Sequence, residues 1–339
     1  MKAIKVTKPF NIEICEVERP EIKSPDDVII KVTSGGICGS DIGIFNGTNS
    51  LAIYPRIIGH EFGGIVEEVG ENATEIKVGD KVAVDPVVSC GQCYACRIGR
   101  HNVCSSLEAM GVHRDGGFRE YVSVNKRNVH KFNEDFDSSL LALVEPYTIG
   151  MQINSRGQIS KGDKVLIVGS GAIGLCTLDV AKRKGAEVLI ADIVPEKLEV
   201  AKKMGANRTV LVSEENLEKA VDEFTNKEGM PVIVDTVCSQ SSFEDSVKMA
   251  SPAGRIVVIG LIDTPSQIAQ ADITKKELTI VGSRLNCNKF DEVVEAFESK
   301  ELKPELLKTH SFDFTQVKDA LKLIENEPEK VIKMVLNFD

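Results

Sequence analysis

The sequence predicts an α/β protein in which a mostly-β part is followed by a doubly wound parallel sheet. Residues up to about 148 consist of short apolar segments separated by glycine-rich turns, a pattern typical of strands. From about Lys161 onward, apolar strands alternate with helices of roughly a dozen residues, which indicates βαβ units. With 339 residues, the chain is long enough for two domains that each bury a core.

Six strands are expected in the mostly-β part of the chain. Turn-forming residues such as Ser24-Pro25-Asp26 and Gly79-Asp80 separate them. The expected strands are Lys2–Val6, Asn11–Glu16, Asp27–Thr33, Gly64–Val69, Lys81–Val84 and Arg119–Val124.

Six further strands are expected in the parallel sheet, with helices between them. They are Lys164–Val168, Glu187–Ala191, Thr209–Val212, Val232–Asp235, Arg255–Gly260 and Leu278–Val281. One of the helices begins at Pro195, since proline is favoured in a first helical turn, and ends before Gly205. Two amphipathic helices and a final strand are expected at Lys289–Ser299, Thr315–Asn326 and Lys330–Leu336.

Composition and charge disfavour several classes of partner. Apolar residues make up 42% and charged residues 27% of the chain, as in ordinary globular proteins, and no apolar run approaches a membrane span. The formal charge is −10 and no basic cluster occurs, so neither nucleic acid nor a membrane is expected as a partner. The first residues alternate like a strand and do not resemble a signal peptide, so we expect a cytoplasmic protein.

Four of the nine cysteines fall within fifteen residues, at Cys90, Cys93, Cys96 and Cys104. Four thiolates at this spacing can complete the closed tetrahedral shell of a structural zinc ion, with Gly91 and Gly99 giving the loop its backbone freedom. A pair of disulfides and an iron–sulfur cluster are the alternatives. The odd cysteine total and the absence of a secretory signal disfavour disulfides.

A dinucleotide site is predicted where the first parallel strand meets its helix. The turn is glycine-rich, and a helix from Leu175 to about Lys184 follows it, so helical N–H groups face a pyrophosphate. Its residues are Gly169, Ser170, Gly171, Ala172, Ile173 and Gly174. Asp192 ends the second strand and can accept hydrogen bonds from both ribose hydroxyls, whereas it would repel a 2′-phosphate, so the sequence favours NAD over NADP. The alternative is that these glycines serve packing alone.

A second set of candidate metal ligands lies in the mostly-β part. It consists of Cys38, His60, Glu61 and Glu145, one thiol, one imidazole and two carboxylates. A catalytic zinc ion keeps three protein ligands and leaves one position for water or substrate. Each residue alone would be unremarkable, but together beside a dinucleotide site they predict a catalytic zinc.

The chain resembles the zinc-dependent medium-chain dehydrogenase/reductase superfamily over essentially its whole length. The matching stretches are Gly36-Ile37-Cys38-Gly39-Ser40-Asp41, Gly59-His60-Glu61-Phe62-Gly63-Gly64, Val78-Gly79-Asp80-Lys81-Val82, the four-cysteine loop, Glu145-Pro146, and the glycine-rich turn with Asp192. The resemblance implies a GroES-like catalytic domain at 1–148 and 286–339 wrapped around a Rossmann domain at 149–285. It also implies two zinc ions per chain, a small-molecule substrate, oxidation of alcohols with NAD(P), and a homodimer or homotetramer.

Other stretches resemble the polyol, threonine and sugar-acid branch, in particular dehydrogenases of L-gulonate or L-galactonate. They are Val84 to Cys90, Gly111-Val112-His113, Asp115-Gly116-Gly117-Phe118 and Gly282-Ser283-Arg284-Leu285-Asn286. A sugar-acid carboxylate could be gripped bidentately by Arg284, and His113, Arg56 and Phe118 are further candidates for the substrate pocket. Threonine and butanediol are alternative substrates. A non-catalytic dinucleotide sensor and a zinc-free quinone reductase are alternative functions, and the complete ligand set argues against both.

One position departs from the pattern of the family. Relatives commonly carry a histidine two residues after the aspartate of the Cys-Gly-Ser/Thr-Asp motif, and this chain has Gly43. Ser40, the cofactor ribose and water then remain as candidates for the proton path, and we expect the substrate proton to leave through Ser40. Four candidate zinc ligands exceed the usual three, so Glu61 and Glu145 are expected to compete or to exchange.

Overall fold

The computed structural model describes all 339 residues, and the chain forms two compact units. The first unit is Met1–Glu145 with Phe290–Lys300 and Leu307–Asp339, and the second is Pro146–Lys289 with Glu301–Leu306. The expected domain boundaries at 148 and 286 lie within four residues of these limits. The short return of Glu301–Leu306 to the second unit was not expected from the sequence.

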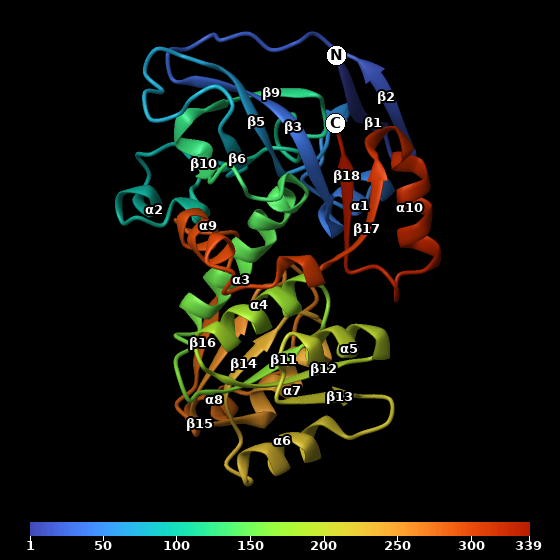
Figure 1. The fold of residues 1–339 in the computed structure, drawn as a ribbon. Coiled ribbons are helices and arrows are strands. Elements are labelled where there is room, and N and C mark those ends of the chain that lie inside the picture. The colour runs from blue at the N-terminus through green and yellow to red at the C-terminus, as the bar shows by residue number, and fades with distance from the viewer. The chain divides into compact units, whose positions relative to one another are not determined.

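Strands dominate the first unit (Figure 1). They are β1 (Lys2–Lys8), β2 (Asn11–Glu16), β3 (Asp27–Ile37), β4 (Arg56–Ile57), β5 (Glu61–Val69), β6 (Lys81–Val84), β7 (Val87–Val88), β8 (Glu108–Ala109), β9 (Tyr121–Asn125), β10 (Val129–Phe132), β17 (Lys308–Asp313) and β18 (Lys333–Asn337). The main sheet has the order β10-β6-β5-β3-β18-β17, and β9 also pairs with β3. Strands β2, β1 and β4 form a smaller sheet, and β7 pairs with β8.

Strand β3 organises the first unit, because it pairs with β5, β9 and β18. It extends to Ile37, four residues beyond the expected end at Thr33, and nine of its eleven residues are buried. Val28, Ile30 and Val32 of β3 pack in one apolar cluster with Met334 and Leu336 of β18. The C-terminal strand is thus part of the core of a unit that begins at residue 1.

Four helices lie in the first unit, and a fifth begins at its end. They are α1 (Gly39–Asn46), α2 (Tyr94–Arg97), α9 (Phe290–Glu298) and α10 (Val317–Asn326), and α3 (Val144–Arg156) begins at the end of the unit. The two amphipathic C-terminal helices were predicted within two residues of their observed ends. Helices α1 and α2 were not predicted, and neither were strands β4, β7, β8, β10 and β17.

The second unit is a six-stranded parallel sheet in the order β13-β12-β11-β14-β15-β16. The strands are β11 (Lys164–Val168), β12 (Glu187–Asp192), β13 (Arg208–Leu211), β14 (Met230–Asp235), β15 (Ala250–Val258) and β16 (Thr279–Gly282). The helices are α4 (Ala172–Arg183), α5 (Pro195–Lys203), α6 (Leu217–Thr225), α7 (Gln240–Met249) and α8 (Gln270–Thr274). This strand order, 3-2-1-4-5-6, is that of a Rossmann domain, with its topological switch between β11 and β14.

The segment Glu301–Leu306 is held in the second unit by polar contacts to α4. The backbone N–H of Lys303 donates to Asp179 Oδ2 at 2.7 Å, and the hydroxyl of Tyr147 donates to the same oxygen at 2.7 Å. Arg183 pairs with Glu301 at 2.5 Å. These long-range contacts explain why the chain re-enters this unit after α9.

None of the helices is long and apolar enough to cross a membrane.

Candidate active site and metal centres

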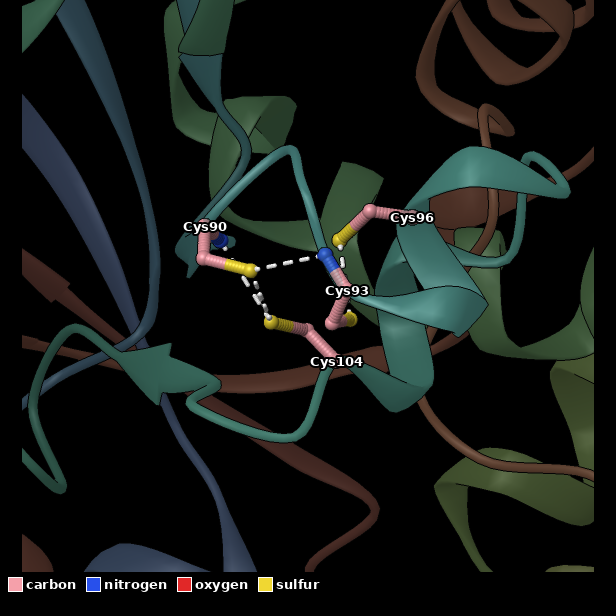
Figure 2. Close-up of side chains that lie close together, drawn as sticks. All are labelled: Cys90, Cys93, Cys96 and Cys104. Atoms are coloured by element: carbon pink, nitrogen blue, oxygen red, sulfur yellow. Dashed lines mark hydrogen bonds between the residues drawn. The ribbon is translucent and has the colours of Figure 1, made fainter.

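The four clustered cysteines converge on one point, as Figure 2 shows. Their sulfur atoms all lie within 4.8 Å of one another, with 3.5 Å between Cys93 and Cys96 and between Cys90 and Cys104. A tetrahedron of zinc–sulfur bonds of ~2.3 Å has edges of about 3.8 Å, so the cluster has the size of a zinc site. No disulfide joins these cysteines. Gly91 and Gly99 adopt positive φ angles of 73° and 75°, the backbone freedom expected of the loop.

Backbone donors favour the thiolate form in this loop. Hydrogen bonds from the backbone of Cys96 and of Ser105 lower the pKa of Cys93 to about 5. Desolvation raises the pKa of Cys96 to about 11, and its hydrogen bond with Cys93 adds to this rise. Cys93 therefore favours the thiolate form and Cys96 the thiol form. A bound divalent cation would displace the protons that remain on these sulfur atoms. The set is closed, because four sulfur ligands leave no open coordination position.

A second group of metal-ligand type joins the ends of two strands of the main sheet. The ligand atoms of Cys38, His60 and Glu61 lie within 4.8 Å of one another. Cys38 is the N-cap of α1, directly after β3, and Glu61 opens β5. Since β3 and β5 are paired neighbours, residues 23 positions apart in sequence meet at one end of the sheet.

The carboxylate of Asp41 fixes the backbone that carries these candidate ligands. Its side chain is fully buried and accepts the N–H of Cys38 at 2.9 Å and the N–H of Gly59 at 3.1 Å. Its Oδ1 also lies 3.7 Å from His60 Nδ1, which has no hydrogen-bond partner. Burial lowers the pKa of His60, but the charges of Asp41 and Cys38 outweigh burial and raise that pKa well above its ordinary value. A site that stabilises positive charge on His60 is one that suits a bound cation.

The carboxylate of Glu61 has a strong partner that the sequence did not indicate. Lys333 Nζ donates to both oxygens of Glu61, at 2.7 Å and 2.8 Å, and both side chains are almost fully buried. Glu61 lies opposite Gly36 of β3, and a Cβ at Gly36 would come within 2.4 Å of Glu61 Oε2. Glycine at this position therefore leaves room for the carboxylate and for the lysine that reaches across from β18.

Glu145 lies outside the group formed by Cys38, His60 and Glu61, although the charges of His60 and Glu61 act on it. Burial raises the pKa of its carboxyl to about 7, His60 acts to lower it, and Glu61 acts to raise it further. The side chain is 5% exposed and lies in the first turn of α3. The structure thus separates the two glutamates that the sequence could not rank.

The glycine-rich turn of the second unit has the geometry of a phosphate cradle. Gly169 has a φ of 98°, and a Cβ at Gly174 would lie 2.0 Å from the carbonyl oxygen of Gly169. At Gly171, the N-cap of α4, a Cβ would meet nothing within 4 Å, and no side chain caps the helix. Open space in front of uncapped helical N–H groups fits a pyrophosphate.

Asp192 is held in place by the turn and by its own strand end. Its Oδ1 accepts the N–H groups of Ile193 at 2.7 Å and Val194 at 2.9 Å, and its Oδ2 accepts the N–H and hydroxyl of Ser170. Four donors use the four lone-pair directions of the carboxylate. A ribose hydroxyl can bind only if one donor moves, and the hydroxyl of Ser170 is the one that can rotate away.

Two exposed apolar side chains, Ile193 and Val237, were not singled out from the sequence. They follow β12 and β14, the strands on either side of β11.

The remaining candidate residues differ in how accessible they are. Ser40 Oγ lies 3.4 Å from His60 Nε2, beside the metal-ligand group. Phe118 is fully buried in the core, where it packs on Phe338, so the structure argues against its contact with substrate. Arg56 pairs with Asp115 at 3.1 Å, and His113 Nδ1 accepts the N–H of Ala109 at 3.0 Å. Arg284 is exposed just after β16.

Gly43 is not required by packing. A Cβ at this position would lie 3.5 Å from Asn49 Cβ and from Thr48 Oγ1, an ordinary contact distance. Glycine at this position therefore relieves no steric conflict. Its effect is that position 43 offers no side chain to a proton path.

A closed site of four cysteines, an open cysteine–histidine–glutamate group and a parallel sheet of the Rossmann order together define the class of zinc-binding, dinucleotide-linked oxidoreductases. Comparison with known proteins identifies the family. Residues 24–134 match the alcohol dehydrogenase GroES-like domain, and residues 172–299 match the zinc-binding dehydrogenase domain. The chain belongs to the zinc-dependent medium-chain dehydrogenase/reductase superfamily and is an enzyme of the zinc-type alcohol dehydrogenase kind.

Several relatives are similar over their full length. The chain is 43% identical to the starvation-sensing protein RspB of Escherichia coli K12, covering 100% of this chain and 99% of the relative. It is 32% identical to the L-galactonate-5-dehydrogenase of the same organism, covering 97% and 99%. The crystal structure of the rspB alcohol dehydrogenase from E. coli CFT073, complexed with NADH, has a TM-score of 0.94 at 42% identity, covering 99% of each chain. The fold predicted from the sequence, GroES-like and Rossmann, is confirmed.

Proposed function

We propose that this enzyme oxidises a secondary alcohol of a polyhydroxy substrate, a sugar acid such as L-gulonate or L-galactonate or else a polyol, and passes the hydride to NAD+. The observation that carries the proposal is the group of Cys38, His60 and Glu61, whose ligand atoms lie within 4.8 Å of one another. In this proposal the first unit is the catalytic domain with two zinc ions, and the second unit binds NAD. A homodimer or homotetramer is the expected assembly.

Zinc bound at this group would supply Lewis-acid chemistry that lowers the pKa of a substrate hydroxyl. The residues of the chain would orient that hydroxyl and transfer its proton away from the site. The hydroxyl of Ser40, whose Oγ lies 3.4 Å from His60 Nε2, is the proposed first relay: it would accept this proton while it gives its own proton to water, since Gly43 offers no side chain for a relay. The closed cysteine site contributes to the shape of its lobe and takes no part in the reaction.

We propose that Glu61 and Glu145 exchange as ligands of the zinc. Two observations support this proposal. Glu61 belongs to the ligand group but its two oxygens already accept Lys333, and Glu145 is buried nearby with a pKa raised to about 7. With Glu145 as the ligand of a bound zinc ion, Lys333 would compensate the charge of Glu61. With Glu61 as the ligand, the buried carboxyl of Glu145 would hold a proton.

NAD is the proposed cofactor, bound through the turn at Gly169, Gly171 and Gly174 with the ribose at Asp192. The rigid carboxylate of Asp192 would repel a 2′-phosphate, which supports NAD over NADP. The NADH complex of the rspB relative supports the same choice. Ile193 and Val237 are proposed to cover the two faces of the adenine.

The proposed substrate class is supported by the likeness to L-galactonate-5-dehydrogenase. The test is a panel of hexonates, neutral polyols, threonine and butanediol with NAD+, followed by the absorbance of NADH. Highest kcat/KM on a hexonate is expected. Highest kcat/KM on threonine or butanediol would favour those alternatives, and NADH binding without turnover on any alcohol would favour a sensor.

Arg284 is proposed to grip the carboxylate of the sugar acid. Arg284→Ala should then lower kcat/KM on hexonates by roughly 10- to 100-fold, because a bidentate charge-assisted contact contributes about 1.5–3 kcal/mol. The matching neutral polyol serves as the internal control and should change little. Equal losses on both substrates would remove Arg284 from this role.

A further inference from the structure

A cavity of about 520 Å³ lies in the first unit, and none of the candidate metal ligands lines it. Its walls come from the segment that includes Lys23, from Met110 just after β8, and from β9 and the loop that follows it, with Arg119, Ser123 and Arg127 on that side. The cavity is therefore separate from the proposed catalytic group, and the proposed function assigns it no role.

Arg119 is the unusual side chain in this cavity. It is mostly buried, its Nε atom has no hydrogen-bond partner, and no ion pair from its guanidinium to another residue is found. Burial lowers its pKa, Asp115 acts to raise it, and Arg114 acts to lower it. An arginine stays protonated at any ordinary pH, so the cavity wall carries a desolvated positive charge without a partner.

The other charges around the cavity do not neutralise Arg119. Asp115 is already paired with Arg56, at 3.1 Å, and accepts the N–H of Ile57. Asp27 accepts the N–H groups of Lys23 and Ser24, at 3.0 Å and 2.9 Å. In the same wall, the side chains of Lys23 and Arg127 have no ion pair. Of the three carboxylates that line the cavity, only Glu21 has neither an ion pair nor a hydrogen bond. Of the four lining cations, Arg114 pairs with Glu108 at 3.7 Å, and Lys23, Arg119 and Arg127 have no ion pair.

We propose that this cavity is a binding site for a small oxyanion, a phosphate or a carboxylate group, anchored by Arg119. A guanidinium presents paired N–H donors that match the oxygens of either group. Arg127 and Lys23 would supply further charge at the rim, and the hydroxyl of Ser123 a hydrogen bond. A site of this kind would respond to the concentration of an anionic metabolite in a chain whose net charge is −10.

The test is calorimetric titration of the full-length enzyme, saturated with NADH so that the dinucleotide site is filled. Inorganic phosphate and malonate are titrated separately at constant ionic strength. Saturable binding of one ion per chain is expected, weakened at least tenfold in Arg119→Gln. Lys8→Gln, which removes an exposed charge of the same unit away from the cavity, is the matched control and should bind like the wild type.

The tighter of the two anions identifies the natural class of ligand. Arg127→Gln, at an exposed position, is the second variant in case Arg119→Gln does not fold, and it should weaken binding severalfold. Absence of saturable binding by the wild type, or equal affinity in the wild type and both cavity variants, would overturn the proposal.

Discussion

At the scale of single residues, the ion pair between Glu61 and Lys333 determines the character of the proposed catalytic site. A carboxylate so close to a thiol and an imidazole would be costly to bury alone. Lys333 neutralises it, and Gly36 makes the contact possible because it carries no side chain. The same carboxylate is therefore both a candidate zinc ligand and one half of a structural ion pair.

Replacement of Lys333 by methionine should destabilise the protein by about 3–5 kcal/mol, since it leaves the buried charge of Glu61 without a partner. The double variant E61Q/K333M should recover a large part of this loss. Lys322→Met, at a side chain that is 70% exposed, is the control and should change stability little. Chemical denaturation of the metal-free proteins measures these differences. A double variant as unstable as K333M would show that the ion pair does not carry the effect.

Asp192 is the second residue whose role can be isolated. Asp192→Ala removes the acceptor for the ribose hydroxyls, so the KM for NAD+ should rise about tenfold or more while the KM for NADP+ falls or stays unchanged. Ser170→Ala leaves Asp192 in place and frees one of its lone pairs, so it should keep the preference for NAD+. Initial rates with both cofactors give the comparison. An unchanged ratio of the two kcat/KM values in Asp192→Ala would contradict the assignment.

At the scale of elements, helices α3 and α4 and the returning segment Glu301–Leu306 meet at Asp179. Its carboxylate accepts Tyr147 from α3 and the N–H of Lys303 from the segment. Burial raises the pKa of Asp179, while these two hydrogen bonds act to lower it. The buried carboxylate of Asp179, which accepts both hydrogen bonds, thus fixes the segment Glu301–Leu306.

Tyr147→Phe should therefore destabilise the protein by about 1–2 kcal/mol at neutral pH, because it removes a donor from a buried carboxylate. The raised pKa means that folded Asp179 binds its proton more tightly than the unfolded chain does, so its ionisation opposes folding as pH rises above about 3.8. Loss of the tyrosine donor raises the pKa of Asp179 further. The difference in unfolding free energy between the variant and the wild type should consequently be larger at pH 7 than at pH 4, and a difference independent of pH would count against this account.

For the whole molecule, one metal site is expected to be needed for turnover and the other for stability. Metal analysis should find about two zinc ions per chain. Cys38→Ala should retain one, lose turnover and keep a nearly native Tm, because the group that includes Cys38 serves the reaction. Cys104→Ser should also retain about one zinc ion but lower the Tm, because the four-cysteine loop depends on its metal for shape. One zinc or none in the wild type would overturn the two-site proposal.

Much of this protein could be predicted from local sequence. The spacing of the four cysteines, the glycine-rich turn between a strand and a helix, and the alternation of apolar segments all depend on neighbours within a few residues. For that reason the strands at Asn11–Glu16, Lys81–Val84 and Lys164–Val168 were predicted to the residue. The GroES-like fold was implied by the family resemblance that the local motifs carry. Helix α1 was missed because its short, glycine-containing sequence has no amphipathic pattern.

Only the tertiary structure decided which distant residues meet. Lys333 contacts Glu61 across 272 positions because β18 and β5 both lie beside β3, a matter of strand order that composition and periodicity do not contain. In the same way the structure placed Phe118 in the core, set Glu145 apart from the group of Cys38, His60 and Glu61, and left Arg119 without a partner in a cavity. Sequence by itself determined the chemistry that is available, since that chemistry is carried by local motifs. The tertiary structure determined which groups neutralise one another, because the burial and pairing of charges depend on long-range packing.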